Sequence, residues 1–378
     1  MTIDAATHLI QETDSKLVLG AVTERLRENE DTGYIGKRNV ELTKAVVASL
    51  RRRKAPVGFK WVKGHSGHTR NEGADRLAGA GAIKGTPDVV DVTIQAELQL
   101  SGAKLQAMTQ RRAYIAIMAR KAKKVSPRPR TVFNLDMVKA GLENQCGAQV
   151  TDKAIWKSLT KGSLFTKEIR RFLWMGIHNA YMIGGYWLRD NMSIEMQARA
   201  TCSICGETES MSHILFECHA EEREIAWKLL KALWMSTGAP WIEPNWGTIF
   251  GAACVQLCND KGSRLAHREH RWALLASETA YHIWKMRCER VIRRDGEPFS
   301  DMEATNRWYA NMNRRMRLDC KSTAKYLGKQ ALKPTFVSLL WGPVLEDADN
   351  LPPDWVTKSG VLVGIRRVDD RGEPGDWR

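Results

Sequence analysis

The segment Gly58–Ala80, reading GFKWVKGHSGHTRNEGADRLAGA, constrains the fold of this chain more than any other stretch. Gly58–Lys63 alternates bulky apolar and basic residues, which is the period of a strand with one buried face, and Phe59 and Trp61 are expected to point inward. A polar, glycine-rich loop follows, and a helix is expected to begin near Asn71. The segment therefore predicts a strand, a loop and a helix in that order.

The loop and the helix of this unit carry side chains that could bind a cation or transfer a proton. Asn71 and Glu72 lie four and three residues before Asp75, so each shares a face of the helix with Asp75, below a loop that carries His65. A carboxylate that can bind a hard cation, next to an imidazole that can carry a proton, suits hydrolysis. A surface loop in front of an ordinary helix is the simpler alternative.

The motif KGHSGHTRNEGADRLA resembles the last active-site segment of type 1 ribonuclease H. The resemblance implies that Asp75 is the final metal-binding Asp, that His65 is the loop His, and that Asp14, in Thr-Asp-Ser, is the Asp at a strand end. Asp14 is equally placed to cap the helix that follows it. The resemblance further implies cleavage of RNA in RNA–DNA hybrids with Mg²⁺ or Mn²⁺, and contacts to nucleic acid from Lys60, Lys63 and Asn71.

The residues before this motif predict a strand at 7–13 and a helix at 15–29, followed by a second helix at 40–53 that ends in a basic run. The first helix is expected to bury Leu17, Val18, Val22 and Leu26, and the second to bury Leu42, Val46, Val47 and Leu50. Two strands joined by a helical crossover are expected to pair in parallel.

In the ribonuclease H fold that the motif resembles, these would be the last two strands of five. The strands and helix that carry the other two acidic ligands, an Asp and a Glu, are then expected to be absent. Glu12 lies two residues before Asp14 but is expected to face the sheet, and Asp4 lies in a terminus without a pattern. Neither is a convincing substitute.

The charge of the chain indicates a polyanionic partner. Its formal net charge is +15 over 378 residues, with a pI near 9.5, and excess Lys and Arg release counterions when they neutralise phosphates. No apolar run approaches the ~20 residues that span a bilayer, and the N-terminus lacks a signal-peptide pattern. We therefore expect no membrane partner and an intracellular protein, in the nucleus or cytoplasm. The eight cysteines predict reduced thiols with one metal site.

A strongly basic segment follows the first domain. Residues 94–125 predict one long helix, and residues 104–130 contain nine Lys or Arg and no acid. Such a run is either a solvated helix face or a phosphate-contacting surface. The nearby motif favours nucleic acid, with candidate contacts at Arg111, Arg112, Lys121, Lys123 and Lys124.

A second motif combines cysteines and a histidine at metal-binding spacing. Cys202 and Cys205 form a two-residue pair, and His213 and Cys218 follow. Three thiolates and one imidazole suit zinc, and because all four positions come from protein, the metal would be structural. Unrelated buried thiols are the alternative, and His219 could replace a ligand.

The region around the second motif also has a recognisable pattern. FLWMGIHNAYMIGGYW followed by TCSICGETESMSHILFEC resembles the zinc-binding region of reverse transcriptases from non-LTR retrotransposons. WGTIFGAA, ETAYHIWKMRCERVI and LPPDWVTKSGVLVGIRR resemble the tail of such elements in basidiomycete fungi. The resemblance covers nearly the whole chain and implies the C-terminal piece of a retroelement polyprotein.

Long helices are expected at 264–294 and 302–327, rich in Trp and Arg. Their cations could hold phosphates beside Trp284, or the aromatic residues could simply form core; the cations are Lys285, Arg287, Arg290, Arg293 and Arg294. Cys254, Cys258 and Cys288 are better explained as core thiols than as a second metal site.

Together these patterns predict an α/β fold, a partial ribonuclease H-like domain with two adjacent parallel strands, then a mainly α-helical region with a small zinc-binding module. The expected domains are 1–86 (ribonuclease H-like), 87–130 (basic linker), 131–200 (helical), 201–220 (zinc module), 221–345 (helical) and 346–378 (irregular tail). The expected function is that of an RNA–DNA hybrid ribonuclease, catalytically impaired by its missing ligands. A non-catalytic, zinc-stapled nucleic-acid-binding remnant and a gene fragment without a role are the alternatives. The oligomeric state cannot be predicted.

Overall fold

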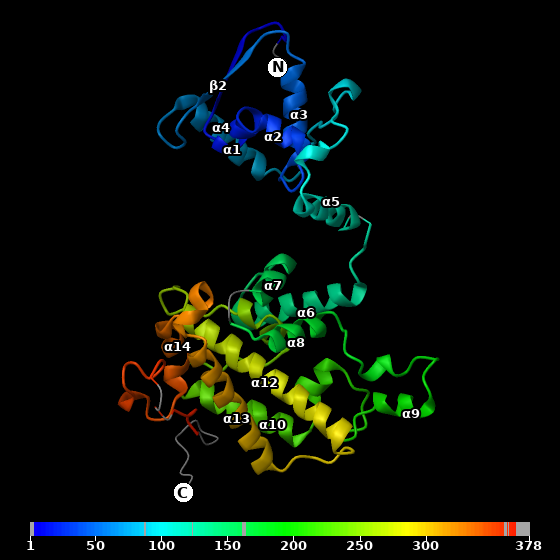
Figure 1. Cartoon of the computed structure of the whole chain (residues 1–378), viewed down its shortest axis with the longest axis vertical. Coiled ribbons are helices and arrows are strands. Elements are labelled where there is room, and N and C mark those ends of the chain that lie inside the picture. Colours follow the sequence, from blue (N-terminus) through cyan, green and yellow to red (C-terminus); the bar gives the residue numbers. More distant parts are fainter. Residues whose placement is uncertain are drawn as a thin grey trace. The chain divides into compact units, whose positions relative to one another are not determined.

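The chain divides into two compact units in a computed structural model that describes residues 4–86, 88–122, 124–160, 164–358, 361 and 363–367. Unit 1 covers Met1–Ser126 and unit 2 covers Pro127–Arg378. Unit 1 runs from blue to cyan in Figure 1, and unit 2 from green to red. The predicted boundaries inside each unit stay predictions.

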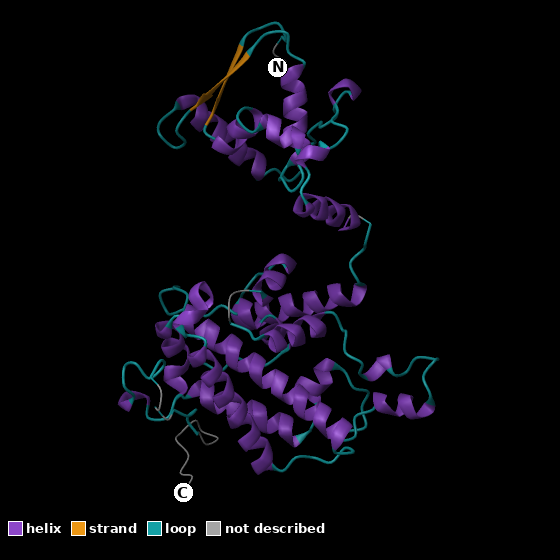
Figure 2. Ribbon diagram, in the orientation of Figure 1, coloured by secondary structure: helices purple, strands orange, loops and turns teal. Residues whose placement is uncertain are grey.

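Unit 1 contains a two-stranded parallel sheet, drawn in orange in Figure 2. Strand β1 (Leu9–Thr13) pairs with β2 (Val57–Trp61), with Leu9 opposite Val57 and Thr13 opposite Trp61. Parallel strands need a crossover connection, and three helices supply it: α1 (Lys16–Val22), α2 (Leu26–Asp31) and α3 (Val40–Arg51). Helix α4 (Thr69–Ala82) follows the loop after β2. The prediction of two adjacent parallel strands with helices is confirmed.

The single helix expected at 15–29 is wrong, because the chain breaks between α1 and α2. Thr23 leaves the helical region of backbone angles, and the Arg25 guanidinium folds back to donate a hydrogen bond to the carbonyl of Leu17. A Cβ on Gly20 would lie 2.6 Å from that guanidinium, so glycine leaves room for it. The break is a tertiary contact that helical periodicity does not reveal.

The long helix expected at 94–125 is also wrong. Only α5 (Gln110–Ala122) is a regular helix, preceded by two short 3₁₀ turns at Ala96–Leu98 and Leu105–Ala107. Between the turns Lys104 is tied to Asp31 twice, by its backbone N–H to the Asp31 carbonyl at 2.8 Å and by its ammonium to the carboxylate at 2.7 Å. These contacts hold the segment against α2 in place of a continuous helix.

Unit 1 has a small hydrophobic core. Among its described residues the buried apolar side chains are Val22, Tyr34, Val47, Ala48 and Val62. Several residues expected inside are exposed, Leu17 at 73% and Trp61 at 43% being examples, and others of the predicted stripes are Val18, Leu42, Val46 and Leu77. A two-stranded sheet covers few side chains, and the Trp61 ring is flanked by the Lys16 ammonium 4.7 Å from its centre. The predicted inward faces are therefore only partly covered.

Unit 2 is helical and holds the main core. Its helices are α6 (Pro129–Cys146), α7 (Asp152–Leu159), α8 (Lys167–Ile177), α9 (Ile194–Gln197), α10 (Glu221–Met235), α11 (Trp246–Phe250), α12 (Ala266–Arg293), α13 (Asp301–Lys321) and α14 (Pro334–Trp341). Helix α8 has a side-chain cap, because the Thr166 hydroxyl accepts a hydrogen bond from the Ile169 N–H. Trp234, Trp272, Trp308 and Trp341 are fully buried around α12. The mainly helical second region is thus confirmed.

The described helices differ in length and polarity, and none combines the length and apolar character needed to cross a bilayer.

Candidate active site and metal centre

Asp14 lies at the end of β1, where the loop after β2 approaches it. The Trp61 indole N–H donates to the Asp14 carbonyl at 3.0 Å, and the Asn71 amide on α4 donates to the Asp14 carboxylate at 3.2 Å. A Cβ on Gly64 would lie 2.8 Å from the same carboxylate, so a larger residue here would require the Asp14 side chain to move. Strand, loop and helix therefore converge on one carboxylate.

The loop between β2 and α4 has a defined local structure. The Glu72 carboxylate accepts a hydrogen bond from the Gly67 N–H at 3.0 Å, and the Ser66 hydroxyl donates to the Lys63 carbonyl at 2.6 Å. His65 has a left-handed backbone, with φ of +51°, and its side chain is 89% exposed. A non-glycine residue in this region is uncommon and is often found at functional sites. The helix begins at Thr69, two residues before the expected start.

Asp75 is linked to the same loop through His65. Nδ1 of His65 lies 3.6 Å from the Asp75 carboxylate. The site thus consists of two linked pairs, Asp14 with Asn71 and Asp75 with His65. These acids and His65 do not form a cluster of three ligands close enough to share one ion in the described part of the chain. The arrangement places an imidazole beside one carboxylate and an amide beside the other, and it offers few carboxylates for a cation.

Glu12 makes other contacts. Its carboxylate lies 3.4 Å from the Lys60 ammonium, 3.7 Å from Nε2 of His68 and 3.6 Å from the Arg70 guanidinium. Three cationic or titratable groups therefore surround this acid. These three groups come from β2 and from the start of α4, so they hold the Glu12 carboxylate between the sheet and that helix.

The candidate nucleic-acid contacts are mostly exposed cations. Lys60 is paired with Glu12, and Asn71 with Asp14, so neither is fully available. On α5, Arg112 donates to the Ala107 carbonyl and lies 3.5 Å from Glu28. The exposed candidates are Lys63, Arg111, Lys121 and Lys124, and Lys123 lies outside the described residues.

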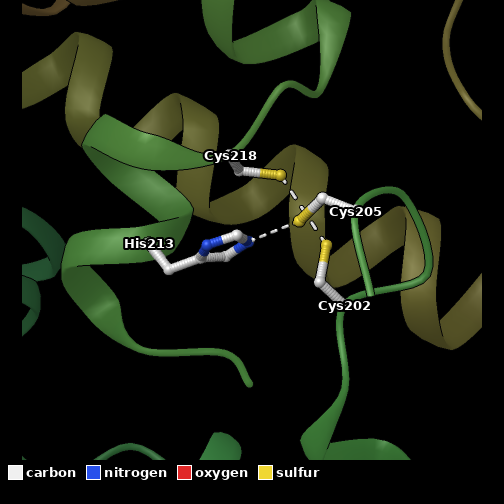
Figure 3. Close-up of side chains that lie close together, drawn as sticks. All are labelled: Cys202, Cys205, His213 and Cys218. Atoms are coloured by element: carbon white, nitrogen blue, oxygen red, sulfur yellow. Dashed lines mark hydrogen bonds between the residues drawn. The ribbon is translucent and has the colours of Figure 1, made fainter. Parts of the chain in front are cut away.

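The four residues of the second motif come together in unit 2 (Figure 3). Their ligand atoms all lie within 4.8 Å of one another; the residues are Cys202, Cys205, His213 and Cys218. The sulfurs of Cys202 and Cys218 are 3.7 Å apart, close to the ~3.8 Å expected for two thiolates bound tetrahedrally to one zinc. Nε2 of His213 lies 3.2 Å from the Cys205 sulfur. The geometry fits a four-ligand zinc site.

Two local elements bring these ligands together. Thr201 and Thr208 form an antiparallel bridge, and Gly206, with φ of +77°, makes the turn that follows Cys205. His213 begins a single π-helical turn, His213–Glu217, whose end places Cys218 beside it. The alternative ligand His219 is 81% exposed and faces Glu224. In the described residues Cys254, Cys258 and Cys288 join no further cluster.

The thiols of this cluster differ in acidity. Burial raises the pKa of Cys202, but hydrogen bonds from His213 and from the N–H groups of Ile204 and Cys205 outweigh burial and lower the pKa to about 6. Burial raises the pKa of Cys218 to about 12. A metal would have to displace the proton of Cys218, since only thiolates bind zinc strongly.

Sequence reasoning missed how the cluster is attached to the core. Arg287 and Arg290 of α12 had been considered as phosphate contacts, but both are buried and paired with acids. Arg287 pairs with Glu209, and Arg290 donates to Glu222 at 2.8 Å and to the Ser203 hydroxyl at 3.0 Å. The arginines therefore fasten the cysteine loop to α12. In the sequence, the only sign of this structural role is that both arginines lie among apolar residues of the expected helix.

Replacing Arg290 with Gln should destabilise unit 2 by about 3–5 kcal/mol, because the Glu222 carboxylate would stay buried without its partner. Both side chains are 2% exposed. Denaturant unfolding of Arg290→Gln beside Arg293→Gln, an exposed arginine on the same helix, measures the difference. The control should lie within about 0.5 kcal/mol of wild type, and equal stability of the two variants would contradict a structural role for Arg290.

Comparison with known proteins shows what the region around the first site is similar to. Residues 3–83 match the RNase H family model. The chain is 37% identical over 76 residues to a protein named ribonuclease H from Zymomonas mobilis, covering 19% of this chain and 47% of that protein. It is 38% identical over 74 residues to ribonuclease H of Methylococcus capsulatus, covering 18% and 46%. No solved structure matches the chain.

The chain spans about half the length of the curated relatives it matches. The family match covers Asp14, the His65 loop and Asp75, and ends one residue after α4. Residues 3–83 are therefore similar to part of the RNase H family, within a longer, mainly helical chain.

Proposed function

We propose that residues 3–83 contribute an RNA–DNA hybrid ribonuclease site in which Asp14 and Asp75 hold divalent cations. The observation that carries this proposal is the approach of the Gly64–His65 turn to Asp14 while His65 itself faces Asp75 at 3.6 Å. Both acids are thereby linked to one loop. The family match over the same residues supports the assignment.

The roles follow from side-chain chemistry. Carboxylate oxygens are the ligands that Mg²⁺ prefers, and such cations activate water and stabilise a leaving oxygen in phosphodiester hydrolysis. Asn71 orients the Asp14 carboxylate through its amide. His65, exposed and beside Asp75, carries the proton between the site and solvent. Recognition of 2′-hydroxyl groups would select the RNA strand.

This chain alone should be a weak enzyme. Two divalent cations about 4 Å apart repel each other, and several carboxylates are needed to offset that repulsion. Asp14 and Asp75 are two, and Glu12 is surrounded by Lys60, His68 and Arg70. A segment or partner that supplies further carboxylates would complete the site.

The proposal extends to the origin of the chain. An RNase H region followed by a Cys₃His cluster, in that order, supports a C-terminal piece of a non-LTR retrotransposon polyprotein of basidiomycete type. The cluster would then belong to a reverse-transcriptase zinc-binding region, with zinc in a structural role. The high positive charge supports nucleic acid as the partner.

A non-catalytic, zinc-stapled nucleic-acid-binding remnant is the second candidate. The small core of unit 1 favours it, because few buried contacts hold Asp14 and Asp75 in place. β1 also has β2 as its only partner in the described sheet, so one of its edges is unpaired. The two candidates differ in whether Asp14 and Asp75 bind a cation together.

Paramagnetic Mn²⁺ added to ¹⁵N-labelled protein tests this difference. Because the cation should lie between the two acids, we expect it to broaden the amide signals near residues 14, 65 and 75 together. Asp14→Asn and Asp75→Asn should each reduce the broadening at all three places. Asp88→Asn, which removes an exposed carboxylate paired with Lys84 in the same unit, should leave it unchanged.

Broadening confined to one of the two acids, or indifferent to both substitutions, would contradict a shared cation site. It would favour the non-catalytic remnant.

A further inference from the structure

An open groove runs between α12 and α13, which lie side by side in unit 2 (Figure 1). Its volume is about 300 Å³, and its charged walls carry three cations, Lys285, Arg307 and Arg314, against one acid, Glu289. The groove is therefore positive.

Lys285 and Arg314 share one hydrogen-bond acceptor in the groove wall. The Lys285 ammonium and the Arg314 guanidinium both point at one neutral atom, the Asn311 amide oxygen, at 3.3 Å and 2.8 Å. In the described part of the chain, neither has a carboxylate within 4 Å. Two like charges sharing one acceptor repel each other. An anion between them would relieve the repulsion.

The neighbouring cations are already neutralised. Arg307 pairs with Glu289 at 2.9 Å and with Glu303 at 2.8 Å, and Arg294 pairs with Glu303 at 3.0 Å. Arg315 pairs with Glu278 and Asp319. Of the three cations that line the groove, Arg307 is thus paired with acids, whereas Lys285 and Arg314 have no carboxylate partner in the described residues.

A buried histidine forms part of the groove wall. His282 is 5% exposed, and its Nε2 has no hydrogen-bond partner. Burial, with the nearby cations Lys285, Arg307 and Arg314, lowers its pKa to about 3, so the ring is neutral near pH 7. An unpartnered buried polar atom beside two unpaired cations is a second sign that a ligand completes this site.

The two cations also border a second groove of about 420 Å³, whose walls include Thr166, Tyr281 and Leu318. They thus lie on the ridge between two grooves. A single small anion would need only one groove, whereas an extended polyanion can cross the ridge and place successive charges near both side chains. Glu168 and Glu278 line the second groove as well, so the positive side is the α12–α13 groove.

We propose that Lys285 and Arg314, with His282 and Asn311 between them, bind the phosphodiester backbone of a nucleic acid in the α12–α13 groove. The proposal rests on nucleic acid as the partner proposed above, but on no chemistry at Asp14 or Asp75. Unit 2 would then hold nucleic acid through its own contact, separate from the RNase H region.

The double variant Lys285→Gln/Arg314→Gln tests the proposal. Its control is Arg317→Gln/Lys321→Gln, which removes the same charge from exposed positions of α13. Fluorescence anisotropy with an RNA–DNA hybrid, between 50 and 200 mM NaCl, gives affinity and salt dependence. Each lost phosphate contact lowers the slope of log affinity against log salt by about one, so the slope of the double variant should fall by about two relative to the control.

Folding and the nuclease site are checked separately. The double variant should melt at or above the wild-type temperature, because it removes the repulsion between Lys285 and Arg314. If these two side chains instead stabilised the fold, the variant would melt at a lower temperature than wild type. Asp75→Asn protein should show the wild-type slope of log affinity against log salt, because the proposed contact lies in unit 2. This expectation holds whether or not Asp75 takes part in a nuclease site.

Equal slopes for the double variant and its control would overturn the proposal. Inorganic phosphate, added at constant ionic strength, distinguishes the source of the anion. Thermal stabilisation by phosphate that is lost in the double variant, together with unchanged hybrid binding, would assign the groove to a free anion and overturn the nucleic-acid assignment.

Discussion

The purified wild-type protein is expected to hold one zinc ion per chain, and Cys205→Ala protein to hold none. The four ligand atoms lie within 4.8 Å of one another, and the sulfurs of Cys202 and Cys218 are 3.7 Å apart, as one tetrahedral ion requires. Structural zinc contributes roughly 10–16 kcal/mol of apparent binding free energy in small modules at neutral pH. Loss of the metal should therefore loosen the cysteine loop from α12 and lower the melting temperature of unit 2.

Elemental analysis by mass spectrometry, with a thermal melt of each protein, measures this effect. Cys258→Ala is the matched control, because Cys258 is an exposed thiol outside the cluster; it should keep its zinc and its melting temperature. Equal zinc in wild type and Cys205→Ala would place the metal elsewhere. Zinc in neither would mean that the four residues are a cluster of buried thiols and an imidazole.

The features predicted correctly from the sequence depend on short-range patterns. The spacing of Cys202, Cys205, His213 and Cys218 is local, so it identified a group that the structure brings together. The strand pair followed from two apolar segments joined by helices, for which a parallel crossover is the simplest topology.

The features that were missed depend on side-chain contacts that hydrophobic periodicity does not encode. The break after α1 requires the Arg25 side chain over Gly20, and the irregular stretch before α5 requires Lys104 on Asp31. Neither contact has a local signature. The roles of Arg287 and Arg290 were missed for the same reason, since their acids are 78 and 68 residues away. The sequence does not distinguish these structural arginines from Lys285, for which no carboxylate partner is found in the described residues; the packing of the folded chain does.

The central claim is that residues 3–83 hold a partial ribonuclease site, so the chain should bind an RNA–DNA hybrid but cut it poorly or not at all. Binding follows from the net charge of +15, and for six to ten phosphate contacts affinity falls by about 10³–10⁵ between 50 and 200 mM salt. Poor cleavage follows from the ligand count. With Asp14 and Asp75 alone, at least one of two cations should be weakly held.

A hybrid-cleavage assay with Mg²⁺ or Mn²⁺ tests this claim most directly, with wild-type, Asp75→Asn and His65→Ala proteins compared at matched hybrid occupancy. We predict that all three leave the hybrid intact, or cut it at the same background rate, while binding it with equal salt dependence. Rapid turnover by wild type that disappears in Asp75→Asn would contradict this expectation, because it would require a complete set of cation ligands, whereas the described residues contain no such cluster around Asp14 or Asp75.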